Sequence, residues 1–290
     1  VFKIAIVFGA VMGIYFLVNS SGGSGVKSKY ETTTENYNAY YDKMKSALPV
    51  VESKDGKIVT VAYSKKMFLF DFNGGIEGNE VELLKRNIDY VLLNAKPTDE
   101  VAIRLYSPGG SVSAYGLAAS ELDRLKQAGI PVTMLVDQVA ASGGYMMAVV
   151  SDKIVAAPFS FIGSVGVVAQ VPIYADFLKK VGVEYKLYTA GDHKRNVVST
   201  IQPTEADEAK MKESLVRIHE QFKRHIKKYR TLVDIDKIAN GEVFSGQEAL
   251  DQKLVDEVST SSDYLLKQYQ KNAQIIYINT EESKSSGFSG

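Results

Sequence analysis

The alternation of strand-like apolar runs with helical segments constrains the fold of this sequence more than any other feature. The runs typical of buried strands lie at residues 67–72, 101–106, 132–137, 153–157, 165–171 and 184–189. Apolar residues at helical spacing predict helices over 77–94 and 117–127, between the first three of these runs. Repeated β-α-β units favour an α/β fold with a mainly parallel sheet and right-handed crossovers. In such folds ligands bind beyond the carboxyl ends of the strands.

Composition excludes several kinds of chemistry. The chain has 34 basic and 34 acidic residues, so no net positive charge favours nucleic-acid binding. It has no cysteine, which excludes thiol catalysis, disulfides and cysteine-ligated zinc. Its histidines are His193, His219 and His225, and no two of them are four residues apart, so we expect no metal site. The two in the charged helical stretch 205–230, His219 and His225, are expected at the surface. A nucleophile must then be an oxygen or a lysine.

The N-terminal segment is strongly apolar. Residues 4–18 form an uninterrupted run of 15 apolar residues after Lys3, somewhat shorter than the roughly 20 that span a bilayer. We expect a retained transmembrane anchor over residues 1–18, because the lysine can reach the membrane interface and a flexible SSGGSG stretch follows. A signal peptide cleaved near residues 19–22 and a buried core helix are the alternatives.

Ser142 stands among small residues in the stretch DQVAASGGYMMAVVSD, residues 137–152. One interpretation is structural: small residues let the start of a buried helix, Tyr145 to Val150, pack closely against a strand. The other interpretation is that a ligand must approach the hydroxyl of Ser142. The rest of the sequence has to decide between them.

Three Gly-containing motifs follow predicted strands, at residues 107–110, 140–144 and 189–194. Acyl transfer needs a hydroxyl, a base and amide donors for the oxyanion, and Ser142 with the amides of Gly109, Gly110 and Gly143 would supply the first and the last. Either His193 or Lys194 is the candidate base. In an extended segment these neighbours point in opposite directions, so only one of them faces the crevice.

Taken together, VAASGGYMMA, SPGG, GSVGV at 163–167 and TAGDHKR at 189–195 resemble the signal peptide peptidase A family of membrane-anchored serine proteases, peptidase family S49, and within it the SohB-type subgroup. The resemblance extends from about Met67 to Glu257 and includes GEVFSGQEAL at 241–250. It rests on four motifs in the family's order, and none of the four would be specific alone.

The resemblance implies a role for five residues. Ser142 matches the family's nucleophile, Lys194 its general base and Ser164 the hydroxyl that orients the lysine. Gly110 and Gly143 match the oxyanion-hole region. No metal or cofactor is implied. The family's substrates are remnants of signal peptides and other hydrophobic or unfolded polypeptides.

The same resemblance implies a ClpP/crotonase-like spiral of ββα units that assembles into rings, with the active site shared between subunits in some members. We therefore expect an anchor over 1–18, a linker and juxtamembrane arm over 19–56, a serine protease domain over 57–260, and a helix, strand and flexible tail over 261–290. The expected location is the inner membrane, with the protease domain on its extracytoplasmic side. A crotonase-like acyl-CoA hydratase or isomerase and a non-catalytic membrane scaffold are the alternatives.

Overall fold

The computed structural model describes residues 30–46, 63–75, 77, 80–191, 194 and 197–282. The strands of its main sheet are β1 (Tyr30–Asn36), β2 (Lys65–Asn73), β3 (Glu100–Tyr106), β4 (Val132–Val136), β6 (Lys153–Ala156), β9 (Glu257–Val258) and β10 (Ala273–Glu282). Their order across the sheet is β1-β10-β2-β3-β4-β6-β9. Every neighbouring pair is parallel except β1 and β10. The described part of the chain is therefore an α/β fold.

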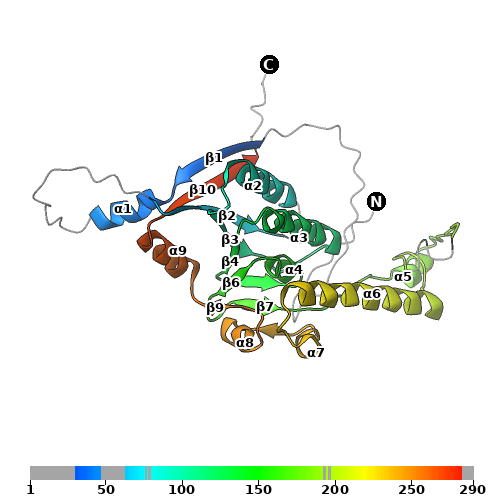
Figure 1. The fold of residues 1–290 in the computed structure, drawn as a ribbon. Coiled ribbons are helices and arrows are strands. Elements are labelled where there is room, and N and C mark those ends of the chain that lie inside the picture. Colours follow the sequence, from blue (N-terminus) through cyan, green and yellow to red (C-terminus); the bar gives the residue numbers. More distant parts are fainter. Residues whose placement is uncertain are drawn as a thin grey trace, which may run out of the picture.

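Helices cover both faces of this sheet (Figure 1). One face carries α2 (Val81–Asn94), α3 (Val112–Gln127) and α4 (Gly143–Ala148), and the long α6 (Glu205–Tyr229) packs against α4. The other carries α1 (Asn38–Ser46) and α9 (Ser261–Gln270). Two short helices, α7 (Ile235–Ile238) and α8 (Gly246–Asp251), follow α6.

Burial on both faces explains why the strands read as continuous apolar runs. In β2, Phe68, Phe70 and Phe72 enter the larger core beneath α2 and α3, whereas Met67 and Leu69 enter the smaller core beneath α9. Successive side chains of a strand point to opposite faces, so a strand covered on both sides needs no polar alternation.

A second, three-stranded sheet carries the segments that lead into Ser142 and Ser164. It contains β5 (Val139–Ala141), β7 (Phe161–Gly163) and β8 (Val243–Phe244) in that order. A parallel bridge between Ser107 and Ala140 connects the end of β3 with β5. The chain thus passes from the main sheet into the small one immediately after β4.

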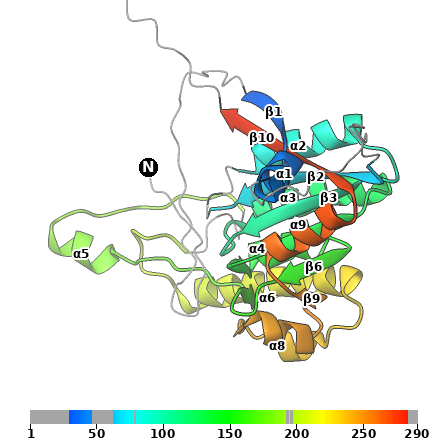
Figure 2. The same cartoon turned by 90° about the vertical axis from the view of Figure 1, so that its left-hand side faces the viewer.

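The strands predicted over 67–72, 101–106, 132–137 and 153–157 are confirmed as β2, β3, β4 and β6. The strands predicted over 165–171 and 184–189 are wrong. The second of these runs belongs to an exposed arm, residues 172–191, which contains α5 (Ala175–Lys180) and projects away from both sheets (Figure 2). Without a neighbouring strand to bond with, its apolar pattern does not produce a ladder.

The helix predicted over 117–127 begins earlier than expected, at Val112. The added part of α3 contains Tyr115, whose side chain is buried in the larger core. The stretch expected as a linker and juxtamembrane arm contributes β1 and α1. None of the described helices is both long and apolar enough to cross a membrane. The predicted anchor, residues 1–18, lies outside the described residues.

Candidate active site

Ser142 occupies a sharp turn between β5 and α4. Its backbone has φ 53° and ψ −118°, a combination that L-residues rarely adopt. Hydrogen bonds on both sides hold this conformation: the Ser142 amide donates to the Gly163 carbonyl at 2.8 Å, and the Ser142 carbonyl accepts from the Met146 amide at 2.8 Å. Strain of this kind costs of order 1–3 kcal/mol and concentrates at functional sites. The expected buried helix after Ser142 is confirmed as α4.

The positions around Ser142 require glycine for two different reasons. A Cβ on Gly143 would lie 2.5 Å from the Tyr115 ring, and one on Gly144 would lie 2.5 Å from the Ser107 carbonyl oxygen. Both positions therefore need glycine for internal packing. A Cβ on Gly109 would instead lie 2.7 Å from the Cβ of Ser142 and 2.8 Å from the Gly143 amide. Of these three glycines, Gly109 alone is required because its backbone approaches the serine itself.

A buried hydrogen-bond chain fixes the loop that carries Gly109 and Gly110. The Tyr115 hydroxyl donates to the Gly75 carbonyl at 2.8 Å and lies 2.6 Å from the Ser107 hydroxyl, which in turn accepts from the Gly109 amide at 3.1 Å. Burial raises the pKa of Tyr115 to about 12, so this hydroxyl remains a donor at neutral pH. The sequence alone gave no signal for Tyr115 or Ser107, because their contacts join three separate segments.

Two backbone amides lie near Ser142. Neither the Gly110 amide nor the Gly143 amide donates a hydrogen bond to another described residue. Gly143 is the first residue of α4, where an amide has no partner inside the helix. Gly110 and Gly143 line the same small pocket as Ser142.

That pocket is apolar. It is narrow, with a cavity volume of about 10 Å³, and no charged side chain lines it. Besides Ser142 and the two glycines, its walls come from α3, α4, α6 and the segment after β7: Val112, Met146, Gly166, Val167, Ile218 and Phe222.

Ser164 lies at the same end of the small sheet as Ser142. Strands β5 and β7 pair in parallel with Ala141 opposite Gly163, so each serine immediately follows one of these paired residues. Ser164 is buried and, like Ser142, has a positive φ, 51°. Its amide donates to the Glu242 carbonyl at 2.7 Å, and its hydroxyl makes one long contact, 3.5 Å, with the Gly241 carbonyl.

Lys194 is not assembled with these serines. Its side chain is exposed and makes no hydrogen bond or ion pair with the rest of the described chain, whereas its amide donates to the Gly191 carbonyl at 3.2 Å. It follows the projecting arm that contains α5 (Figure 2). His193, the other candidate base, lies outside the described residues. The structure therefore brings Ser142, Ser164, Gly110 and Gly143 together and leaves Lys194 apart from them.

The prediction that His219 and His225 are simple surface residues is wrong. Both are partly buried, and each bonds a carbonyl in a site segment: His225 Nε2 lies 2.9 Å from the Met146 oxygen, and His219 Nε2 lies 3.3 Å from the Val165 oxygen. Burial lowers the pKa of His225. These contacts attach α6 to the helix after Ser142 and to the segment after Ser164. Among the described residues, no cluster of three His, Asp or Glu side chains could hold a metal ion.

Comparison with known proteins gives a consistent family assignment. Residues 124–275 match peptidase family S49, and residues 1–122 match the peptidase family S49 N-terminal region.

Individual relatives point to the same family. "Probable protease SohB" of Haemophilus influenzae is 48% identical over 219 residues, which cover 76% of this chain and 62% of the relative. A protein of the same name from Buchnera aphidicola of Acyrthosiphon pisum is 48% identical over 202 residues, 70% of this chain and 60% of the relative. Another, from Buchnera aphidicola of Schlechtendalia chinensis, is 35% identical over 292 residues, 91% of this chain and 96% of the relative. The chain thus spans about 60% of the length of the first two relatives, and it belongs to peptidase family S49.

Proposed function

We propose that this chain is a serine endopeptidase that forms an acyl-enzyme on Ser142. One observation carries the proposal: the hydroxyl-bearing residue sits in a strained turn, in an apolar pocket that also presents the unused amides of Gly110 and Gly143. Amide donors held in place before the reaction are what a tetrahedral oxyanion requires. The names of its relatives, which describe probable proteases, support hydrolysis of peptide bonds.

In the proposed acylation step, Ser142 Oγ attacks the carbonyl carbon of the scissile peptide bond and its proton passes to the neutral amine of Lys194. The oxyanion accepts hydrogen bonds from the two glycine amides. Collapse of the tetrahedral intermediate breaks the C–N bond, and Lys194 returns the proton to the leaving amine. In deacylation, Lys194 takes a proton from the water that attacks the ester, and it returns this proton to Ser142 Oγ as the second product leaves. Ser164 is proposed to orient the lysine amine.

The exposed position of Lys194 gives this mechanism a structural requirement. Burial against apolar groups disfavours the charged form of a lysine, so the base has to be covered before it can act. The arm before it is rich in exposed apolar side chains: Ile173, Tyr174, Phe177, Val181, Val183, Tyr185, Leu187 and Tyr188. We propose that the arm packs against a second copy of the chain in a ring, where Lys194 of one subunit meets Ser142 of another.

The finer expectations belong to the same proposal. The fold is proposed to be of the ClpP/crotonase type, and residues 1–18 to form a single-pass anchor in the inner membrane with the protease domain on the extracytoplasmic side. The proposed substrates are signal-peptide remnants and other hydrophobic or unfolded polypeptides. The apolar lining of the Ser142 pocket supports a hydrophobic residue beside the cleaved bond.

The test is hydrolysis of an unfolded protein and of a hydrophobic signal-peptide mimic by detergent-purified protein, beside its Ser142→Ala and Lys194→Ala variants. We expect cleavage by the wild type and none by either variant, provided that both assemble as the wild type does. Activity that survives in both variants contradicts the mechanism. An inert wild type that binds coenzyme A tightly would favour a thioester enzyme instead.

Mixing the two inactive variants tests whether subunits share the site. If a ring contains both variants, some interfaces combine an intact Ser142 with an intact Lys194, and activity returns. If both residues act within one chain, the mixture stays inactive.

A further inference from the structure

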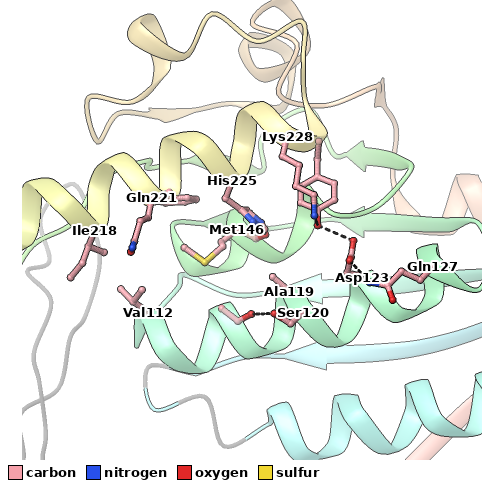
Figure 3. Close-up of a pocket in the computed structure, with 13 residues that line it drawn as sticks. Val112, Ala119, Ser120, Asp123, Gln127, Met146, Ile218, Gln221, His225 and Lys228 are labelled. Atoms are coloured by element: carbon pink, nitrogen blue, oxygen red, sulfur yellow. Dashed lines mark hydrogen bonds between the residues drawn. The ribbon is translucent and has the colours of Figure 1, made fainter.

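A long groove lies between α3 and α6 and continues the pocket of Ser142. It has a volume of about 500 Å³, and Met146 of α4 contributes to its floor (Figure 3). Four residues line both the groove and the Ser142 pocket: Val112, Met146, Ile218 and Phe222. The groove therefore adjoins the Ser142 pocket along these four side chains.

The dimensions of the groove fit an extended polypeptide. Its lining on α3 runs from Val112 to Gln127, which is about 22 Å at 1.5 Å per helical residue. Extended chain covers about 3.3–3.6 Å per residue, so this length corresponds to about six residues.

The chemistry changes along the groove. The walls shared with the Ser142 pocket are apolar, and the exposed Gln221 of α6 lies at this same end, beside Phe222 (Figure 3). Ser120 of α3, further along, is also an exposed polar residue. The carboxamide of Gln221 makes no hydrogen bond with another described residue, so it can both donate to and accept from a peptide group. Helix backbones bond internally and cannot offer a strand edge, so such side chains have to bind the main chain of a ligand.

A polar cluster closes the far end. The Tyr229 hydroxyl donates to Asp123 at 2.8 Å, Gln127 donates to the same carboxylate at 2.7 Å, and Lys228 donates to the Tyr229 hydroxyl at 2.7 Å. Although partial burial acts in the opposite direction, the hydrogen bonds from Gln127 and Tyr229 lower the pKa of Asp123, which stays ionised. An apolar side chain gains nothing at this end, so the groove favours polar residues there.

We propose that the α3–α6 groove binds about six extended residues of the substrate polypeptide, with apolar residues at the end beside the Ser142 pocket and polar residues toward Asp123 and Lys228. The proposal rests on the proposed peptidase function for the identity of the ligand. It names Ser120 and Gln221 as residues that determine specificity without taking part in bond cleavage.

Peptide binding to the Ser142→Ala protein tests this directly, because it needs no turnover. The probe is a fluorescein-labelled 12-residue peptide with a central leucine pair and serine- and asparagine-rich ends, followed by fluorescence anisotropy. A phenylalanine at position 120 would fill the groove, and one at position 113 is the matched control, since Ser113 is also an exposed serine of α3 but does not line the groove.

We expect Ser120→Phe to raise the Kd at least tenfold and Ser113→Phe to change it less than twofold. Gln221→Phe, on the opposite wall, should act like Ser120→Phe and guards against a folding defect specific to α3. The proposal is overturned if the Ser142→Ala protein does not bind the peptide, or if Ser120→Phe and Gln221→Phe bind it as tightly as Ser113→Phe does. If the wild type hydrolyses no peptide but the Ser142→Ala protein binds the probe in the groove, the proposed peptidase function is refuted. The proposed peptide binding in the α3–α6 groove is then still supported.

Discussion

Replacing Gly109 with alanine should damage the candidate site more than the fold, and Gly129 provides the matched control. Both glycines have positive φ, 95° and 71° respectively. A Cβ on Gly129, just after the end of α3, would have no atom within 4 Å, whereas one on Gly109 would press on Ser142 and on the Gly143 amide. The two variants therefore share the backbone strain and differ in the collision.

The expected magnitudes follow from these two contributions. Placing alanine at positive φ costs about 1–2 kcal/mol in each variant. The contacts of 2.7 and 2.8 Å at position 109 add an overpacking cost of about 1–3 kcal/mol. Relief of that collision has to move either the serine or the amide after it. A displacement of about 1 Å at a reacting centre typically costs on the order of a hundredfold in rate.

Urea unfolding and hydrolysis of the hydrophobic peptide measure the two effects separately. We expect Gly129→Ala to lose about 1–2 kcal/mol of unfolding free energy and to retain wild-type kcat/KM when folded. Gly109→Ala should lose about 2–5 kcal/mol and at least about a hundredfold in kcat/KM. Equal stability and equal activity in the two variants would refute the close approach of Gly109 to Ser142 as a functional constraint.

Three further predictions follow from the same contacts. Ser142→Gly should be about 1 kcal/mol more stable than Ser142→Ala, because glycine relieves the strain at φ 53° that alanine keeps; equal urea midpoints would argue against strain at this turn. Tyr115→Phe should lower the free energy of unfolding by about 1–3 kcal/mol, because the Ser107 hydroxyl and the Gly75 carbonyl lose a buried partner; an unchanged midpoint would contradict the hydrogen-bond chain. Burial lowers the pKa of His225 in the folded state, so the unfolded chain binds the proton more readily and stability should fall as the pH drops below about 6.5. His225→Gln should make this decline shallower between pH 7 and 5 in urea titrations, and an identical slope would exclude His225 as its source.

Much of the fold was predictable from local pattern. The runs 67–72, 101–106, 132–137 and 153–157 are strands because each is buried on both faces, and burial of that kind leaves a continuous apolar signature. The helix after Ser142 follows from the same reasoning. Of the candidate site residues, Ser142, Ser164, Gly110 and Gly143 lie at one end of the small sheet or in the pocket beside it.

The sequence pattern predicted the wrong structure where the surroundings of a residue come from distant segments of the chain. The run 184–189 has a strand-like composition but lies in an exposed arm, where it pairs with no strand of either sheet. His219 and His225 stand in a highly charged stretch that suggests solvent, yet α6 packs against α4 and brings both imidazoles to backbone carbonyls. Neither outcome can be deduced from the neighbouring residues.

The sequence by itself determined that the chain is an α/β protein with a hydroxyl in a turn rich in small residues, since periodicity and residue size are local properties. Only the tertiary structure shows which contacts require small residues at these positions. Gly143 and Gly144 fit against Tyr115 and Ser107, and Gly109 fits against Ser142, through contacts between segments about 30 residues apart. The tertiary structure also separated Lys194 from Ser142 within one chain, because the position of an exposed arm depends on what packs against it.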